Sequence, residues 1–97
     1  MTPEQIELAR HALGLDGYRK KSYRNHFVTG PGSDDYTNWQ AMVAAGYAKR
    51  RAGSVLTGGD DLFWLTEAGA RLALKGETLD QEDFPPPRSP ANNAEAK

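Results

Sequence analysis

The sequence predicts one small α+β domain, with the order helix, strand, helix, two-stranded hairpin, helix. Three observations support this. Residues 2–14 and 33–46 carry apolar side chains at helical spacing, begin with a capping residue and end at glycine. Residues 47–51 and 62–65 are short strand-like segments that flank a glycine-rich loop, as hairpin strands do. A length of 97 residues allows at most one domain.

The first helix is expected over residues 2–14. Thr2 is a capping residue, Pro3 suits the first helical position, and Gln5 completes a capping box with Thr2. Gly14 is a natural residue to end the helix. The expected apolar face consists of Ile6, Leu8, Ala9, Ala12 and Leu13.

The segment after the first helix has few helix signals, and a short strand is expected over residues 23–28. Because side chains alternate along a strand, Tyr23 and Phe27 would share one face, and Arg24 and His26 the other. The following TGPGS breaks the chain before the next helix.

The second helix is expected over residues 33–46, with Ser33 or Asp34 as its cap and Gly46 at its end. Its apolar stripe consists of Tyr36, Trp39, Met42 and Val43. Its opposite face is small and weakly polar, and consists of Thr37, Asn38, Ala41, Ala44 and Ala45.

The hairpin is expected to continue into a third helix over residues 66–76. Phe63 and Leu65 would share one face of the second strand, and Leu62 and Trp64 the other. Thr66 would cap the helix, and Gly76 would stop it. Leu72 and Ala68 are predicted to pack on one side of it.

The last segment, residues 77–97, is predicted to be a disordered acidic and proline-rich tail, which leaves residues 1–76 as the domain. Leu79 and Phe84 are its only large apolar residues, too few to offset the entropy lost on ordering. The tail carries five acidic and two basic residues, whereas residues 17–53 carry seven Lys or Arg residues and two Asp. A basic middle indicates a polyanion partner, although the same charges also solvate a small domain.

The absence of cysteine excludes disulfides, thiolate ligands and thiol nucleophiles. No segment has the ~20 apolar residues that a membrane span needs, and no signal-peptide pattern follows Met1, so a cytoplasmic protein without a membrane partner is expected. Two histidines alone, His11 and His26, make no plausible zinc set, and no nucleotide-binding glycine motif is present. No cofactor is expected.

The segment WQAMVAAGYAKRR, the glycine-rich loop and LFWLTEAG together resemble a winged helix-turn-helix domain. In regulators of the MarR and PadR types, a helix ends in glycine and runs into a basic strand. The second strand there leads into a Leu-Thr-x-x-Gly helix start, matched here by Leu65, Thr66 and Gly69. The helix that should precede the recognition helix has no clear counterpart in YRKKSYRNHFVTGPG. The chain as a whole is similar to small proteins of tailed phages and prophages, from which no activity follows.

The Gly-Gly-Asp-Asp stretch at residues 58–61 resembles the Gly-Gly-Asp-Glu hairpin of diguanylate cyclases, and it contains the Gly-Asp-Asp triplet of viral RNA polymerases. Both families need larger domains, with further carboxylates to hold two metals. Asp60 and Asp61 would point to opposite faces of a strand. The stretch is therefore interpreted as a turn, and the protein as no enzyme.

A non-enzymatic binding module is the predicted function, most plausibly one that associates with nucleic acid through backbone contacts at the basic hairpin and the basic segment. Trp64 is expected to lie across the hairpin from the basic strand, where an exposed ring suits stacking on unpaired bases. The candidate binding residues are Arg19, Lys20, Lys21, Arg24, His26, Asn38, Gln40, Lys49, Arg50, Arg51 and Trp64.

A protein-interaction module is the alternative, using the small-residue face of the second helix, and a homodimer is compatible with both hypotheses. The helix that would read a groove begins with Asp34 and Asp35 and exposes no Arg or Lys, which disfavours sequence-specific DNA recognition through it. This objection does not apply to binding of the nucleic-acid backbone or to protein binding.

Overall fold

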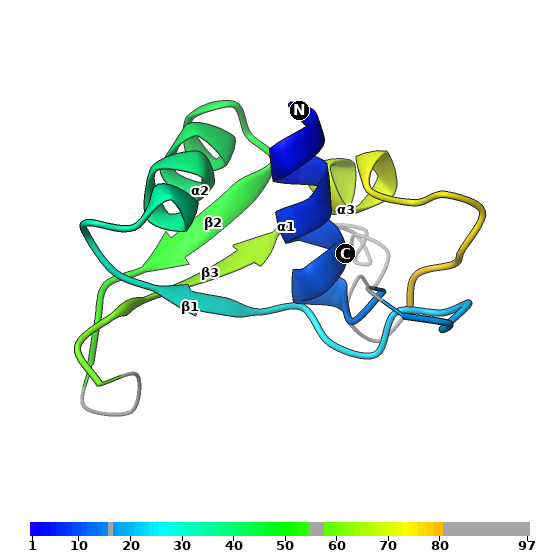
Figure 1. The fold of residues 1–97 in the computed structure, drawn as a ribbon, viewed down its shortest axis with the longest axis horizontal. Coiled ribbons are helices and arrows are strands. Elements are labelled where there is room, and N and C mark those ends of the chain that lie inside the picture. Colours follow the sequence, from blue (N-terminus) through cyan, green and yellow to red (C-terminus); the bar gives the residue numbers. More distant parts are fainter. Residues whose placement is uncertain (16, 55–57, 81–97) are drawn as a thin grey trace, which may run out of the picture.

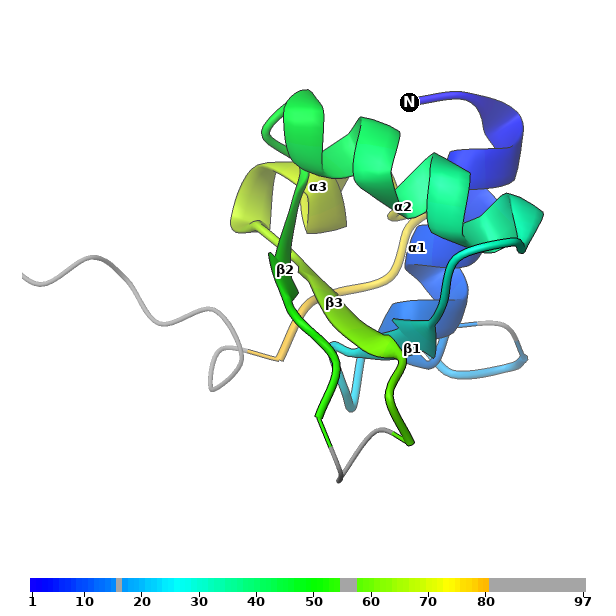
Figure 2. The same ribbon diagram turned by 90° about the vertical axis from the view of Figure 1, so that its left-hand side faces the viewer.

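The computed structural model describes residues 1–15, 17–54 and 58–80, and it confirms the α+β class. The three strands form an antiparallel sheet in the order β1-β3-β2, and the three helices lie on one face of it (Figures 1 and 2). The elements in chain order are α1 (Pro3–Leu13), β1 (Phe27–Thr29), α2 (Asp34–Ala44), β2 (Ala48–Arg51), β3 (Asp61–Leu65) and α3 (Glu67–Leu72).

The predicted helix starts are confirmed. Thr2 and Gln5 form the reciprocal capping box, with both hydrogen bonds at 3.1 Å. Gly14 closes α1 with a φ of 79°, a left-handed conformation that favours glycine. Ser33, rather than Asp34, caps α2, because its hydroxyl accepts from the Tyr36 amide at 3.1 Å.

The core lies between the helices and the covered face of the sheet. Trp39 of α2 and Phe63 of β3 are both fully buried, with their rings stacked and the centroids 5.6 Å apart. Phe27 of β1 contacts the same Trp39 ring at 5.4 Å. The predicted burial of Trp39 and the predicted faces of β3 are thereby confirmed. Other buried apolar residues are Ala9, Ala12, Leu13, Leu15, Met42, Ala48, Leu65, Ala70, Ala73 and Leu79.

The strand predicted over residues 23–28 is shorter and shifted, since β1 begins at Phe27. The amide groups of Tyr23 and His26 donate instead to carbonyls of the last turn of α1, both at 3.2 Å. The last carbonyls of a helix have no partner within it, so the segment after α1 satisfies these acceptors before it reaches the sheet. The Asn25 side chain then pairs with the backbone of Leu65, donating at 3.0 Å and accepting at 2.8 Å.

The third helix also differs from the prediction. It ends at Leu72 rather than near Gly76, and Leu72 and Ala68 are exposed rather than packed. The buried face consists of Gly69, Ala70 and Ala73. A Cβ on Gly69 would lie 2.1 Å from the Tyr47 carbonyl oxygen. Because the backbones of α3 and Tyr47 approach so closely, only the smallest residues of α3 can face inward. Leu72 therefore faces outward.

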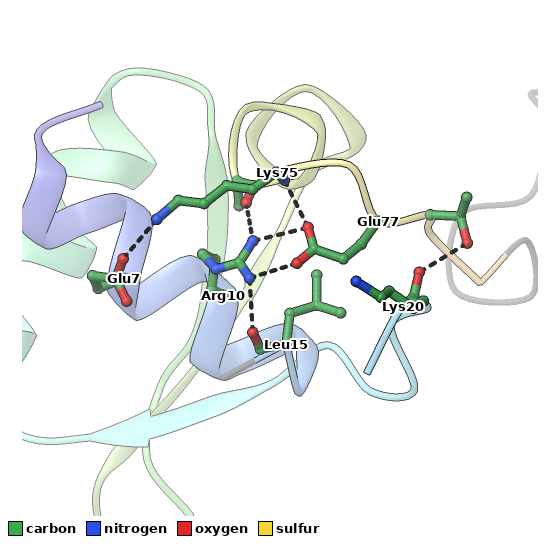
Figure 3. A network of polar contacts seen from close by, with 8 residues as sticks. Glu7, Arg10, Leu15, Lys20, Lys75 and Glu77 are labelled. Carbon is green, nitrogen blue, oxygen red and sulfur yellow. Dashed lines mark hydrogen bonds and ion pairs between the residues drawn. The ribbon is translucent and has the colours of Figure 1, made fainter. Parts of the chain in front are cut away.

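The folded part extends past the expected boundary at Gly76, because residues 77–80 pack against the domain. Figure 3 shows the reason: Glu77 accepts two hydrogen bonds from the guanidinium of Arg10, a buried residue of α1, at 2.6 and 3.0 Å. The same guanidinium donates to the carbonyls of Ala73 and Leu15, both at 2.9 Å. The first four residues of the predicted tail are therefore folded, and its residues 81–97 lie outside the described part of the chain.

Residues 78–80 continue this attachment alongside the segment that follows α1. The Thr78 amide donates to the Lys20 carbonyl, and the Ser22 amide donates to the Thr78 carbonyl, both at 2.9 Å. The buried Ser22 hydroxyl accepts from the Asp80 amide at 2.8 Å. Leu79 is only 8% exposed. Within the described residues, no helix combines the length and the apolar composition that a membrane span requires.

Truncating Trp39 should unfold much of the domain. Trp39→Ala removes the ring that contacts both Phe27 and Phe63, and a cavity of this kind costs about 3–5 kcal/mol. Thermal unfolding followed by circular dichroism measures the loss. The exposed Gln40 on the same helix gives the control, since Gln40→Ala should melt like the parent. Equal melting of Trp39→Ala and the parent would contradict the described core.

Removing the charge of Glu77 should destabilise the fold much more than removing that of Glu67. Glu77→Gln weakens charge-assisted hydrogen bonds of a buried arginine, worth about 1.5–3 kcal/mol. Glu67 forms an exposed i,i+4 pair with Arg71, worth only about 0.3–0.5 kcal/mol. Urea unfolding of the two variants compares them. A chain ending after Asp80 should likewise be more stable than one ending after Gly76.

The contribution of Glu77 should disappear in acid. Its hydrogen bonds with Arg10 lower the pKa of the Glu77 carboxyl to about 2, from an ordinary value of about 4.3. Because the folded-state pKa is the lower one, the stabilisation is complete above about pH 4.3 and is lost as the pH falls towards 2. The difference in stability between the parent and Glu77→Gln should shrink over that range. A difference that stays constant between pH 6 and pH 2 would contradict the pairing.

Candidate functional site

The face of the sheet turned away from the helices carries two rows of side chains. Lys49 of β2 lies directly opposite Trp64 of β3, as predicted, and Arg51 lies opposite Leu62. On the other side of β3, Val28 pairs with Leu62. His26, which directly precedes β1, is also exposed. We call these six residues the outer sheet face: His26, Val28, Lys49, Arg51, Leu62 and Trp64.

Burial along β3 confirms that this face is separate from the core. Asp61, Phe63 and Leu65 are buried, whereas Leu62 and Trp64 between them are only partly buried and are not packed against the core cluster. Val28 is 43% exposed. Partly exposed apolar side chains flanked by charges occur at interaction surfaces.

The cations of this face have no ionic partner among the described residues. Lys49 and Arg51 are exposed, and neither forms an ion pair with a described carboxylate. Arg50, by contrast, forms an ion pair through its Nε with the Asp61 carboxylate at 2.6 Å. Of the three cations in the predicted basic strand, Lys49 and Arg51 are therefore available to a ligand, whereas Arg50 stabilises the fold.

Asp61, the last residue of the Gly-Gly-Asp-Asp stretch, has a structural role in the hairpin. Its carboxylate accepts from Arg50, from the Tyr36 hydroxyl at 2.8 Å and from the Gly53 amide at 2.8 Å. The hydrogen bond from Arg50, followed by that from Tyr36, lowers the pKa of Asp61. Gly58 and Gly59 adopt φ values of 69° and 95°, as a turn requires. In the described part of the chain, no three His, Cys, Asp or Glu side chains gather as metal ligands would.

The basic segment, which we define as residues 19–24, precedes β1 in the chain. Figure 1 shows this segment below the helices, at the end of β1 that lies away from the hairpin loop. Arg19, Lys20 and Lys21 are exposed and form no ion pair with a described carboxylate. The guanidinium of Arg19 lies over the Tyr23 ring, 4.1 Å from its centroid. Arg24 already takes part in the fold, because its guanidinium donates a hydrogen bond to the His11 carbonyl at 2.7 Å.

A shallow pocket of about 270 Å³ lies beside β1, next to the outer sheet face. Two of its lining residues, His26 and Val28, also belong to that face. It is otherwise lined by His11, Arg24 and Phe27. The sequence had grouped His26 with the basic segment but gave no signal for the contribution of His11, because the two lie 15 positions apart. The hydrogen bond from the His26 amide to the Ala12 carbonyl, beside His11 on α1, brings them together.

Two of the predicted site residues lie elsewhere. Asn38 faces a groove of about 570 Å³ between α1 and α2, and its side chain bonds the Gln5 amide and the Asp34 carbonyl. This groove also holds four carboxylates, those of Glu4, Glu7, Asp34 and Asp35. Gln40 is exposed on α2, on the helix side of the sheet. The two amides therefore do not belong with the cations of the outer sheet face.

No helix lies between α1 and α2 in the described residues 17–33, where a helix-turn-helix would place one. No family model, curated protein or solved structure matches the chain.

Replacing Asp61 should destabilise the hairpin. Asp61→Asn removes the charge that binds Arg50 and weakens its bonds to Tyr36 and Gly53, so the melting temperature should fall. Glu67→Gln alters an exposed carboxylate that forms only an i,i+4 pair with Arg71, and it should lower the melting temperature much less. Amide hydrogen exchange should show faster exchange in β2 and β3 of Asp61→Asn alone. A larger effect of Glu67→Gln would contradict the structural role of Asp61.

Proposed function

We propose that this protein is a non-enzymatic nucleic-acid-binding module, which contacts the phosphate backbone through the outer sheet face and the basic segment. The observation that carries the proposal is the pair of exposed cations, Lys49 and Arg51, beside Trp64 on a face without helices. No carboxylate lies within the two rows of this face. A phosphate chain supplies the anions that these side chains lack among the described residues.

The positions of the carboxylates also favour binding of a nucleic acid to the outer sheet face rather than to the helices. The four carboxylates of the groove between α1 and α2 lie on the helix side of the sheet, and they would repel phosphates brought to that side. A polyanion is therefore favoured on one side of the molecule and disfavoured on the other. Binding through the N-terminal end of α2, as a recognition helix would bind, is the arrangement that the charges oppose.

A protein partner is the second candidate, and a specific observation favours it. Ala41, Ala44 and Ala45 of α2 are all exposed, and together they form a surface that another backbone can approach closely. Such a partner would bind the helix side and leave the cations of the outer sheet face unused. A second copy of the chain is one such partner.

Removing the cations of the outer sheet face should weaken binding selectively. We expect Lys49→Ala/Arg51→Ala to bind a fluorescein-labelled oligonucleotide more weakly in anisotropy titrations. The slope of log K against log salt should become shallower by about 1.4–1.8, as expected for two lost phosphate contacts. Arg71→Ala/Lys75→Ala is the matched control, because it removes two exposed cations that are paired with Glu67 and Glu7.

The control variant should bind like the parent. Equal losses in the two double variants would mean that only net charge matters and that the outer sheet face is no binding site. If the parent itself binds no nucleic acid at low salt, the proposed function is wrong, and the helix side becomes the surface to test with protein partners.

A further inference from the structure

The outer sheet face has an arrangement that distinguishes between kinds of nucleic acid. Trp64 occupies the central strand, with Lys49 directly across from it on β2 and the exposed His26 just before β1. An aromatic ring beside a lysine presents a surface for one base and a neighbouring phosphate. In the next row of this face, Leu62 lies between Val28 and Arg51.

A base pair within a duplex cannot use this surface. Its base faces are covered by the neighbouring pairs, so only an unpaired base can stack on Trp64. A duplex reader instead needs an element that enters a groove. The helices lie on the other side of the sheet, and α2 begins with two aspartates. The outer sheet face can therefore form only phosphate contacts with a duplex. With a single strand it can form phosphate contacts and also stack on a base.

We propose that the ligand is a single-stranded nucleic acid, with one base stacked on Trp64 and the adjoining phosphates held by Lys49 and Arg51. This inference rests on the proposed function and specifies its ligand. The strand crosses the sheet towards the pocket beside β1, where Arg24 and the two histidines line an opening large enough for a phosphate or a sugar. Because the contacts are to the base face and the backbone, recognition is tolerant of sequence.

The two tryptophans give a direct test on the unmodified protein. Trp39 is fully buried in the core, whereas Trp64 is partly exposed on the outer sheet face. In ¹⁵N–¹H spectra, addition of a twelve-residue thymidine oligonucleotide should shift the indole signal of Trp64 and leave that of Trp39 in place. The Trp64→Phe spectrum assigns the signals. A Trp39 shift as large as that of Trp64 would overturn the proposal.

Affinity measurements complete the test. The single strand should bind more tightly than a twelve-base-pair duplex at the same salt concentration. Trp64→Leu should weaken binding of the single strand by about 5-fold or more, which corresponds to the loss of one stacked base. Its affinity for the duplex should hardly change. Trp64→Phe keeps an aromatic ring and should recover most of the lost affinity, whereas a purely structural role of Trp64 would affect both ligands equally.

Failure of this inference is distinguishable from failure of the proposed function. If both ligands bind equally, the Trp64 signal does not move and Lys49→Ala/Arg51→Ala weakens both, the protein binds nucleic acid by charge alone and the stacking proposal is overturned. If neither ligand binds, both the proposed function and the stacking proposal are overturned.

Discussion

The arrangement of this small domain depends on one buried cation. Arg10 lies on the inner side of α1, and a guanidinium cannot be buried there without acceptors for its N–H groups. The acceptors come from three other places in the chain: the carbonyl of Leu15, the carbonyl of Ala73 and the carboxylate of Glu77 (Figure 3). The turn after α1, the end of α3 and the segment beyond it are thereby held to one point. The basic segment attaches to that same structure, because residues 20–22 bond residues 78–80.

The hairpin has a comparable anchor in Asp61. By binding Tyr36, Arg50 and Gly53, its carboxylate joins α2, β2 and the start of the hairpin loop at the inner side of the sheet. With Arg50 engaged there, the adjacent Lys49 and Arg51 project to the opposite side, since neighbours on a strand alternate. A structural ion pair on one side thus accompanies two available cations on the other. Four carboxylates line the groove between α1 and α2, whereas Lys49 and Arg51 lie on the outer sheet face, so the two sides of the sheet carry different charges.

Local patterns predicted much of this arrangement. The caps at Thr2, Ser33 and Thr66 follow from short-range hydrogen bonds that a few neighbouring residues specify. The burial of Trp39 follows from helical periodicity, and the position of Trp64 across the hairpin from the basic strand follows from the pairing of the two hairpin strands. Other expectations were wrong where distant segments compete for the same groups. Tyr23 and His26 bond α1 instead of extending β1, because the last carbonyls of that helix needed donors.

The sequence by itself determined the class of the fold, the positions of the helix starts, the hairpin and the presence of a basic segment, because each of these depends on residues close together in the chain. The tertiary structure alone decided that Glu77 belongs to the domain, that Leu72 faces outward, that Arg50 is committed to Asp61 and that Asn38 lies among acids. It also decided which side chains share the outer sheet face. These facts depend on hydrogen bonds, ion pairs and close packing between residues as many as 67 positions apart, and no local pattern specifies such partners.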